Sequence, residues 1–399
     1  MIKELTIEKT RLPVGWLSEK LDTLCDVEYG TRVVRKRDGG TIHPVYGGGG
    51  ATFFMDSFNR EDCLVVARFA MSEKCTRFVR GKFFLNDSGL SVKPKDTDII
   101  SQEFLNMYFI FLNDYIYSLA RGAAQKNLNV PAFRKIEIQY PESLSQQQQI
   151  VAIIEKAFAA KDTAKANAEQ NLQNAKELFE SYLQNVFENK GDDWEEKPLG
   201  EVTSKIGSGA TPRGGKASYK EEGISLIRSM NVHDFYFKKK NLAFIDDKQA
   251  DALSNVTLQE KDVLLNITGA SIARCCIIPK EYLPARVNQH VSIIRAKKDT
   301  INPVFLASLL TSKYFKDQIL EIGEQGATRQ AITKVQLENF HISYPKEIEE
   351  QEKVIQNINL IKAETKKLET IYTKKIADLE EMKKSVLQKA FSGQLNTIN

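Results

Sequence analysis

The sequence lacks the features that would place a protein in a membrane or send it out of the cell. No apolar run approaches the length of a membrane span, and the apolar stretch Phe104–Leu112 is broken at once by Asn113 and Asp114. The N-terminal "MIKELTIEKTRLP" is charged and has no apolar centre, unlike a secretory signal. Cysteine is scarce, and the five residues form an odd set without CxxC spacing. We therefore expect reduced thiols in a cytoplasmic protein, and no zinc site.

Nucleotide-binding loops are also missing. The segment "GATPRGGKAS" at 209–218 contains Gly215-Lys216, but a phosphate-binding loop would need glycine at Ala210 and a hydroxyl at Ala217. The segment "YGGGG" at 46–50 lacks the strand, GxGxxG and helix of a dinucleotide fold, which favours a flexible loop.

Other catalytic signatures are absent as well. The four histidines are scattered, with no HExxH and no deaminase pattern. There is no Gly-x-Ser-x-Gly elbow and no Asn/Asp-Pro-Pro-aromatic tetrapeptide of the kind found in amino-methyltransferases. We expect neither a catalytic residue nor a metal in this chain.

Net charge decides little. A formal charge of +4 over 399 residues permits nucleic-acid binding without arguing for it. Basic residues gather in "GTRVVRKRDGG" at 30–40 and at Lys238–Lys240. A solvated surface explains either cluster equally well.

What the sequence does contain is an internal repeat. The passage "GAAQKNLNVPAFRKIEIQYP" at 122–141 returns as "GATRQAITKVQLENFHISYP" at 326–345, 204 positions later and without a gap. At the same offset, "SYLQNVF" at 181–187 lies over "SVLQKAF" at 385–391. Neither proline nor glycine occurs from Glu142 to Lys190 or from Lys346 to Ser392. Both stretches are rich in Ala, Gln, Glu, Lys and Leu, which predicts one long helix in each copy.

The two predicted helices carry a heptad seam in the same phase. Eight of ten seam positions are apolar in each copy. This pattern favours an antiparallel coiled coil over two surface helices, the alternative being that each helix pairs with another protein. The residues expected to pack the helices together are Ile150, Ile154, Leu178, Tyr182, Ile358, Ile361, Leu368, Leu379 and Met382.

Looser matches relate the segments that precede the helices. Trp16, Leu21 and Leu24 align with Trp194, Leu199 and Val202, each set opening a helical turn before a glycine-rich loop, and "DCLVV" at 62–66 resembles "KDVLL" at 261–265. Short apolar runs between Gly, Asn and Asp predict strands. The expected fold is α+β and pseudo-two-fold symmetric: a mixed α/β domain at 1–144, a helical spacer at 145–190, a second mixed domain at 191–345 and a helical spacer at 346–399.

The predicted helix length suggests a reason for the duplication. A helix of about 45 residues spans roughly 65–70 Å. Two such helices laid antiparallel would form a spacer between two similar domains, as in an isologous dimer fused into one chain. Duplex DNA fits such an arrangement, with half-sites one or two turns apart at about 34 Å per turn.

These segments together resemble the specificity (S) subunit of Type I restriction–modification systems, over almost the whole chain. "GSGATPRGGKASY" at 207–219 resembles the Gly-Thr-Pro loop of that family, and "LIRSMNV" at 226–232 resembles its next strand. "LLNITGASIARCCII" at 264–278 resembles a hairpin usually written Gly-x-Ser-Ile-Gly. This chain has Ala273 in place of the last glycine, so the conformation of that turn is not settled by the resemblance. In the first half, "HPVYGGGG" at 43–50 resembles an alternative domain opening, whereas "VARFAMSEKCTRFV" at 66–79 matches the hairpin poorly.

The resemblance implies a DNA-binding subunit of a larger enzyme, not itself catalytic. Each mixed domain would be a target-recognition domain that reads one part of a split, asymmetric site in double-stranded DNA. Methyltransferase (M) subunits, two in number, would dock on the helices and bind S-adenosylmethionine. Restriction (R) subunits, driven by ATP with Mg2+, would complete a nuclease for phage defence.

Base recognition needs side chains with well-placed donors and acceptors, chiefly Arg, Lys, Asn and Gln, while others hold phosphates. For the first domain the predicted DNA-binding residues are Thr31, Arg32, Arg35, Lys36, Arg37, Arg68, Arg77, Gln125 and Lys126. For the second they are Thr211, Arg213, Lys216, Arg228, Asn231, Ser271, Arg274, Arg329 and Gln330. Gln125-Lys126 and Arg329-Gln330 rank highest because both pairs follow the repeated Gly-Ala passage. The alternative for each is a solvated or locally paired residue.

Two other function classes remain open from the residues alone. A coiled-coil scaffold would explain the heptads but not two glycine-punctuated domains that carry arginines. A self-sufficient methyltransferase or nuclease would need the motifs that are missing.

Overall fold

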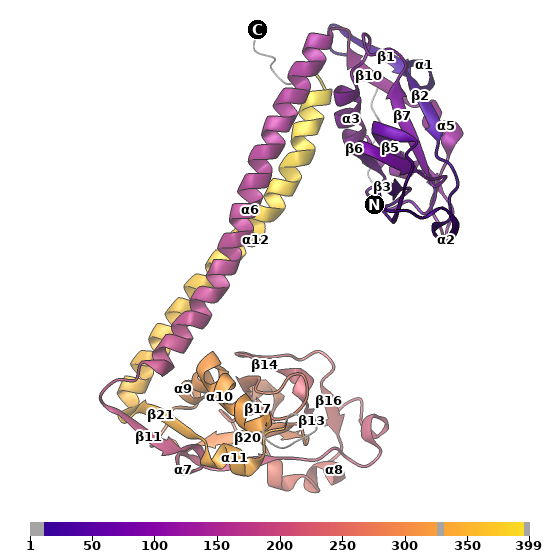
Figure 1. Ribbon diagram of the computed structural model, residues 1–399. Helices are drawn as coiled ribbons and strands as arrows, with labels where there is room; N and C mark the ends of the chain where they lie inside the picture. Colours follow the sequence, from indigo (N-terminus) through magenta and orange to yellow (C-terminus); the bar gives the residue numbers. More distant parts are fainter. Residues whose placement is uncertain (1–11, 325–330, 395–399) are drawn as a thin grey trace. The chain divides into compact units, whose positions relative to one another are not determined.

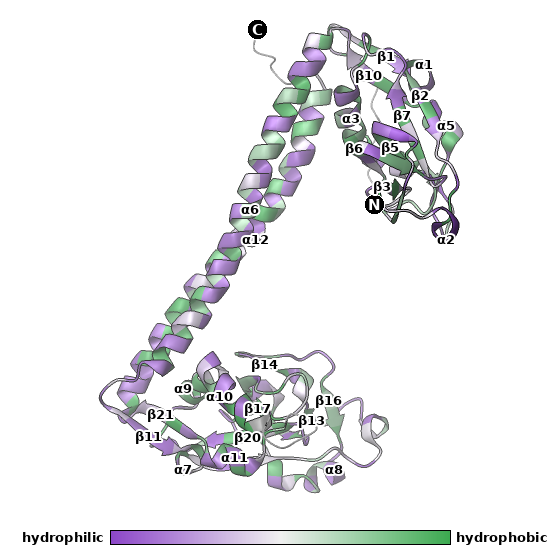
Figure 2. Ribbon diagram, viewed as in Figure 1, coloured by the Kyte–Doolittle hydropathy of each residue, from purple (hydrophilic) through white to green (hydrophobic). Residues whose placement is uncertain are grey.

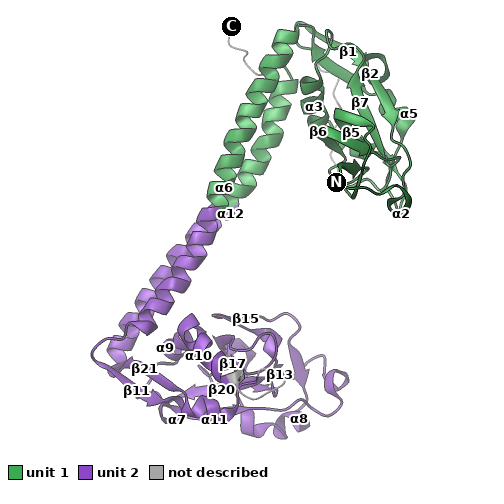
Figure 3. Cartoon of the chain, viewed as in Figure 1, with its two compact units in different colours: residues 1–169, 374–399 green, residues 170–373 purple. Residues whose placement is uncertain are grey.

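The computed structural model describes residues 12–324 and 331–394. The chain forms two compact units, residues 1–169 with 374–399 and residues 170–373 (Figure 3). Each unit contains one mixed α/β domain and part of two long helices, α6 (Leu144–Glu188) and α12 (Ile348–Phe391) (Figure 1). No helix among the described residues is long and apolar enough to cross a membrane.

The first domain is built on a six-stranded sheet in the order β2-β7-β5-β6-β3-β4, beside a two-stranded sheet of β1 and β10. Its elements are β1 (Trp16–Lys20), α1 (Leu21–Leu24), β2 (Cys25–Tyr29), α2 (Arg35–Asp38), β3 (His43–Tyr46), β4 (Phe53–Met55), β5 (Arg60–Ala67), β6 (Thr76–Leu85), β7 (Gly89–Pro94), α3 (Gln102–Phe111), α4 (Asn113–Ser118), β8 (Ala120–Arg121), β9 (Asn127–Leu128), α5 (Val130–Arg134) and β10 (Glu137–Pro141).

The second domain is built on a four-stranded sheet in the order β12-β20-β17-β18, beside a pair of β11 and β21 and a three-stranded sheet β16-β13-β19. Its elements are β11 (Trp194–Pro198), α7 (Leu199–Val202), β12 (Thr203–Ser208), η1 (Gly215–Ser218), β13 (Ile224–Ile227), η2 (Ser229–Asn231), β14 (Val232–His233), β15 (Tyr236–Phe237), β16 (Ala243–Ile245), α8 (Asp247–Asp251), η3 (Ser254–Val256), β17 (Val263–Asn266), β18 (Cys275–Ile277), η4 (Lys280–Tyr282), β19 (Ala285–Val287), β20 (Val291–Ala296), α9 (Pro303–Thr311), α10 (Lys313–Glu324), α11 (Lys334–Asn339) and β21 (His341–Pro345).

The two domains share one strand order. β2-β7-β5-β6 in the first corresponds to β12-β20-β17-β18 in the second, with every neighbouring pair antiparallel, and β1–β10 corresponds to β11–β21. The residues aligned across the repeat form equivalent helical turns, α1 and α7. Leu21 and Leu24 of α1 are buried, and so are Leu199 and Val202 of α7. The domains differ in what covers the second face of this sheet. In the second domain, the β16-β13-β19 sheet packs on that face and forms a separate apolar cluster with it.

Buried apolar runs explain the central strands. β5 carries an unbroken buried stretch from Cys63 to Ala67, and the whole of β17 is buried. Such strands, covered on both faces, need no alternation of polar and apolar residues. On one face the core is completed by Phe104 and Tyr108 of α3 in the first domain and by Phe305 and Leu309 of α9 in the second.

A fully buried glutamine fixes the start of each long helix on its domain. Gln147 accepts a hydrogen bond from the backbone N–H of Ser101 at 2.9 Å and donates to the carbonyls of Ile99 and Pro141, both at 2.9 Å. Gln351 lies 204 positions later and repeats the pattern. It accepts from Asn302 at 2.7 Å and donates to Thr300 at 3.1 Å and to Pro345 at 2.9 Å.

The end of the opposite long helix completes the core of each domain. Phe391 at the end of α12 packs on Phe104 of the first domain, with ring centroids 5.5 Å apart. Phe187 at the end of α6 packs on Phe305 of the second domain at 5.6 Å. Within each unit, therefore, the start of one helix lies beside the end of the other, and the two pack antiparallel.

Most of the expected helix-packing residues lie on the contact face. Ile150, Ile154 and Ile358 are buried, and Tyr182, Ile361, Leu368 and Leu379 are half-buried. The same mixture of apolar and polar residues runs along both helices (Figure 2). Two polar residues at equivalent seam positions, Lys161 and Thr365, are also buried.

Leu178 and Met382 are corrections to the predicted seam. They stand at equivalent positions of the repeat, yet they are 53% and 39% exposed. After Ala175 the buried face of α6 advances in steps of four, through Phe179 and Leu183 to Phe187. Here α6 packs on the second domain, and α12 likewise packs on the first domain through Leu387 and Phe391, so neither helix end packs on its partner helix alone and the heptad pattern no longer applies.

The turn at Ala273 keeps the geometry that glycine would supply. Ala273 has φ of 64°, in the left-handed region, and its side chain is fully buried. Ala273 therefore keeps the turn conformation expected for glycine at this position. Glycine would adopt this left-handed backbone conformation with less strain than alanine does.

Candidate nucleic-acid interface

Five loops of the first domain are tied together beside β7. The backbone N–H of Thr31, after β2, donates to the carbonyl of Leu85 at 2.9 Å. Arg68, after β5, donates to the carbonyl of Ser88 at 2.8 Å, and Gly48 donates to the Ser88 hydroxyl at 3.1 Å. The loop between β8 and β9 joins them because Met71 donates to the carbonyl of Lys126 at 2.9 Å. We call this set of loops (residues 30–34, 47–50, 68–75, 86–88 and 122–126) loop surface 1.

Two predicted DNA-binding arginines are held by their neighbours: Arg68 belongs to loop surface 1, and Arg77, on β6, contacts its 47–50 loop. The Arg68 guanidinium lies over the rings of Tyr29 and Phe69, at 4.7 and 4.2 Å from their centroids. Arg77, on β6, donates to the carbonyls of Gly48, at 3.1 Å, and Gly49. Partial burial lowers the pKa of the Arg77 guanidinium. Both side chains are therefore preorganised rather than free in solvent.

The other predicted residues of the first domain are exposed. Gln125 and Lys126 lie on the β8–β9 loop, where Gly122 has φ of 111° and the tight turn leaves no room for a Cβ atom. Thr31 and Arg32 follow β2. Arg35, Lys36 and Arg37 form most of the short helix α2, and Arg37 is paired with Asp38 at 2.8 Å. The structure thus separates an α2 group from the residues of loop surface 1.

Three loops of the second domain meet in an equivalent way. Ile267, after β17, donates its backbone N–H to the carbonyl of His290 at 3.0 Å, as Arg68 does to Ser88. Gly209, after β12, donates to the carbonyl of Asn288 at 3.2 Å. A Cβ atom at Gly209 would lie 1.9 Å from the carbonyl oxygen of Val287, so only glycine allows this approach. We call these loops (residues 209–213, 267–274 and 287–290) loop surface 2.

Loop surface 2 contains the predicted residues Thr211, Arg213, Ser271 and Arg274. The Thr211 hydroxyl donates to the side chain of Gln289, and the Ser271 hydroxyl accepts from Asn266 at 3.1 Å. Arg213 is exposed and Arg274 is half-buried. Lys216, on η1, is exposed a few residues beyond.

Arg228 and Asn231 lie beside loop surface 2, on the segment after β13. The Arg228 guanidinium donates to the carbonyl of Asn241 and lies 5.3 Å from the centroid of the Tyr219 ring, while its Nε has no partner among the residues that the structure describes. Asn231 is fully buried, accepts from the Arg228 N–H at 3.2 Å and donates to the carbonyl of Lys238 at 2.9 Å. Its amide shapes the loop and does not face solvent.

Arg329 and Gln330 lie outside the described residues. Ala331, the next residue, forms a β-bridge with Thr268, and Ile332 donates its N–H to the carbonyl of Ile267 at 2.9 Å. In the first domain, Leu128 donates to the carbonyl of Arg68 at 2.8 Å at the equivalent position of the repeat. The repeated passage therefore returns to the same strand end in both domains.

Sequence reasoning missed the two side chains that link loop surface 2. The Gln289 amide donates to Nε2 of His290 at 3.2 Å, and Nδ1 of His290 lies 2.6 Å from the hydroxyl of Thr268. Neither residue belongs to a recognisable motif. The signal that could have found them is position, since both precede β20 and face the loops after β12 and β17.

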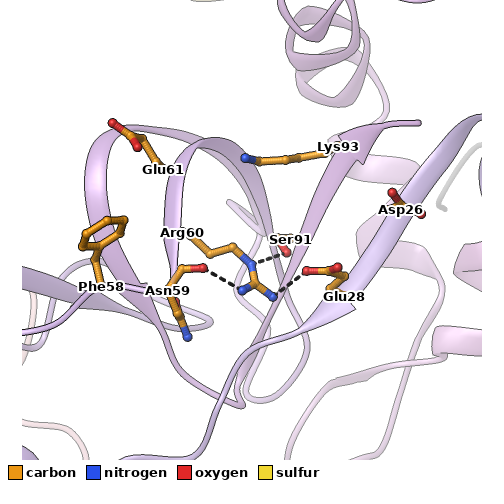
Figure 4. A pocket seen from close by; sticks show the side chains of 8 residues that line it. All are labelled: Asp26, Glu28, Phe58, Asn59, Arg60, Glu61, Ser91 and Lys93. Atoms are coloured by element: carbon orange, nitrogen blue, oxygen red, sulfur yellow. Dashed lines mark hydrogen bonds and ion pairs between the residues drawn. The ribbon is translucent and has the colours of Figure 1, made fainter. Parts of the chain in front are cut away.

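A recess on the sheet of the first domain is a separate feature (Figure 4). It is lined by Asp26, Glu28, Phe58, Asn59, Arg60, Glu61, Ser91 and Lys93. Arg60 donates to the Ser91 hydroxyl at 2.7 Å and to the Asn59 carbonyl at 2.8 Å, and pairs with Glu28 at 2.9 Å. The arginine is thus used within the domain. Among the described residues no group of three or more His, Cys, Asp or Glu side chains could hold a metal ion.

Comparison with known proteins agrees with this arrangement. A family model described as the Type I restriction modification DNA specificity domain matches residues 13–174 and again residues 191–379. The chain belongs to this family. The duplication is therefore a duplication of the specificity domain, and the two mixed α/β domains are its target-recognition domains.

Two curated specificity subunits are similar in sequence. The Type I restriction enzyme EcoBI specificity subunit of Escherichia coli is 25% identical over 175 residues, which cover 44% of this chain and 36% of that protein. The Type I restriction enzyme MjaVIII specificity subunit of Methanocaldococcus jannaschii is 24% identical over 343 residues, covering 80% of this chain and 77% of that protein.

Two solved structures share the fold of this specificity-family chain. One, from a study of complex assembly and conformational transition of the type I R-M system, has a TM-score of 0.74 at 18% identity and covers 97% of this chain and 100% of its own. The HsdS subunit from Thermoanaerobacter tengcongensis has a TM-score of 0.64, also at 18% identity, covering 97% of this chain and 99% of its own.

Proposed function

We propose that this chain is the non-catalytic DNA-recognition subunit of a Type I restriction–modification complex. It would read a bipartite, asymmetric target in double-stranded DNA, with loop surface 1 contacting one half-site and loop surface 2 the other. The observation that carries this proposal is the repetition: two domains with the same strand order each place polar and basic loop residues beside equivalent strand ends.

The chemistry of the loops supports base recognition. Arginine, glutamine and threonine side chains supply the donors and acceptors that base edges in the major groove require. Arg68 and Arg77 are already held by aromatic rings and carbonyls, which lowers the entropy lost on binding. Exposed lysines such as Lys126 and Lys216 would contact phosphates and set the register.

The catalytic groups would belong to partner subunits. Two methyltransferase subunits, binding S-adenosylmethionine, would dock on α6 and α12, and restriction subunits would supply ATP- and Mg2+-dependent cleavage in the cytoplasm. The paired helices leave exposed apolar side chains, among them Leu178, Leu360 and Ile371, that a docked protein could cover.

A binding titration at several salt concentrations tests the proposal. The chain, alone and with its co-purified methyltransferase subunits, is titrated against plain duplex DNA, and site-specific methylation is mapped in cells. We expect affinity to fall steeply with salt and methylation to appear only with the partner. A coiled-coil scaffold would bind no DNA, and a self-sufficient enzyme would modify DNA unaided. Either result would overturn the proposal.

A further inference from the structure

Gln289 occupies a special position on loop surface 2. Its side chain is exposed, yet both polar atoms of its amide are held from within the domain. The Thr211 hydroxyl donates to Oε1, and Nε2 donates to Nε2 of His290 at 3.2 Å. His290 is held in turn by the hydroxyl of Thr268, 2.6 Å from Nδ1. Three separate loops thus fix the plane of one exposed amide.

The backbone beneath the amide is equally constrained. Asn288 is buried, and its carbonyl accepts from Gly209 at 3.2 Å while its N–H donates to Ile227 at 3.0 Å. Its side-chain oxygen accepts from the N–H of His290 at 3.0 Å. Gln289 therefore projects from a turn that is bonded to two strand ends, and a change at the side chain need not disturb that turn.

The hydrogen-bond inventory of the amide shows what it can still bind. A glutamine amide has two N–H donors and an oxygen with two lone pairs. Thr211 and His290 use one of each. Counting the described part of the chain, one donor and one acceptor remain, and this is the pair that adenine complements in the major groove, where N6 donates and N7 accepts. A fixed amide makes such a bidentate contact without losing further side-chain freedom.

We propose that Gln289 is a specificity-determining residue that reads an adenine in the half-site recognised by the second domain. Thr211 and His290 are positioning residues that hold its amide. The inference rests on the proposed function and adds to it the identity of one base and of the residue that reads it.

Replacement of the amide tests the inference. In cells that carry the methyltransferase subunits of the same locus, the full chain and its Gln289→Glu and Gln289→Met variants are compared by single-molecule methylation mapping. A carboxylate can only accept hydrogen bonds and favours cytosine, whereas methionine removes the bidentate contact at similar size. We expect the wild-type motif to contain an A·T pair that the variants no longer require, with discrimination at that position reduced roughly 5- to 150-fold.

Two controls separate a reading role from a structural one. Gln259 is exposed in the turn before β17, at the opposite end of that strand from loop surface 2, so Gln259→Glu should leave the motif unchanged. The half-site read by the first domain should also keep its sequence in every variant, which shows that the chain is folded and assembled. Thr211→Val should relax the same base position as Gln289→Met, because it frees the amide.

The outcomes are distinct. If the wild-type chain directs no sequence-specific methylation, the proposed function fails, and this inference fails with it. If the wild type yields a two-part motif that both Gln289 variants leave intact, the proposed function stands and Gln289 does not read a base. If the variants lose all methylation, binding of the purified complexes to duplexes with each base at that position decides. A uniform loss over all four bases would reject the reading role.

Discussion

At the scale of single residues, buried amides hold each domain to its helix. Gln147 and Gln351 each bond one backbone N–H and two carbonyls in a site closed to water. A buried backbone group without a partner costs roughly 1–3 kcal/mol. Each glutamine satisfies three such groups at a junction where the chain passes from a strand into a long helix, so it stabilises the junction out of proportion to its size.

Replacement of Gln351 by alanine should therefore destabilise the second unit. We expect a loss of roughly 2–5 kcal/mol in the free energy of unfolding, since the N–H of Asn302 and the carbonyls of Thr300 and Pro345 lose their partner. Chemical denaturation followed by circular dichroism measures it. Gln356→Ala is the matched control, because Gln356 is exposed on the same helix. Equal stability of the two variants would contradict the role given to Gln351.

The cysteines are a second residue-scale test. All five are buried and unpaired. Burial raises the pKa of Cys63 and Cys75 from 9.0 to about 11 and of Cys25 and Cys276 to about 12, and it also raises the pKa of Cys275 well above 9.0. Because the thiolate is the reactive form, the folded protein at pH 8 should consume almost no alkylating reagent, whereas the protein in urea should consume five equivalents. Rapid reaction of the folded protein would show that these sites open.

The same shifts predict how stability depends on pH. A thiol whose pKa is raised by folding contributes stability that is fully present below the unfolded value near 9 and is lost as the pH rises through about 11 to 12. The unfolded chain releases these protons first, so unfolding becomes easier. The urea midpoint should therefore fall between pH 8 and pH 10.5. Reduced loss in a Cys63→Ala variant would tie the effect to the thiols.

Prediction from sequence succeeded unevenly for single residues. Arg68 and Arg77 were predicted from residue type. The structure places Arg68 in loop surface 1 and Arg77 in contact with it, and their binding to DNA stays a prediction. Asn231 was predicted on the same ground of residue type, but it is buried. Its amide bonds the backbone of its own loop, a use that residue type does not distinguish from exposure to DNA. Gln147 is hidden in the run Gln146–Gln149, and only its match to Gln351 across the repeat distinguishes it.

At the scale of elements, each target-recognition domain depends on two helices that are distant in sequence. The first domain packs on the start of α6, through Ile150 and Ile154, and on the end of α12, through Leu387 and Phe391. The second packs on the start of α12, through Ile358, and on the end of α6, through Phe187. The repeat and the antiparallel pairing of the helices were predicted from the sequence and are confirmed, but the side chains through which each helix end packs on a domain could not be predicted, because periodicity shows that a face is apolar and not what covers it.

Removal of one ring at such a junction should affect one unit only. The ring of Phe391 is 5.5, 5.0 and 5.3 Å from the rings of Phe104, Tyr108 and Phe111. Phe391→Ala should cost the first unit about 3–5 kcal/mol and lower its thermal transition by roughly 6–20 °C, leaving the transition of the second unit in place. Calorimetry of this variant, of Phe187→Ala and of the exposed control Gln388→Ala would show which unit responds. If Phe391→Ala shifted both transitions equally, the helix ends would not act locally.

At the scale of the whole molecule, two similar recognition domains are joined by two long helices, and the length of the helices bears on the distance between two DNA half-sites. Four strands share one order in both domains and the backbone contact after β5 is repeated after β17, but the loops themselves differ in sequence, as an asymmetric target would require. The seam between the two helices contains the buried polar residues Lys161 and Thr365, although apolar residues at these positions would bind the helices to each other more strongly. A buried polar residue at a seam position commonly fixes the register of two helices, and a fixed register is what a spacer of defined length needs.

Matched insertion of one heptad in both helices tests the spacer. Seven residues placed after Ala168 and after Tyr372, which are equivalent in the repeat, keep the seam in phase and add about 10 Å at ~1.5 Å per residue. Methylation mapping should then show the same two half-sites separated by about three more base pairs, at ~3.4 Å each. Seven residues inserted instead in the exposed turn Glu221–Glu222 should leave the gap unchanged. A parental gap in the double-insertion variant would mean that something other than helix length sets the separation.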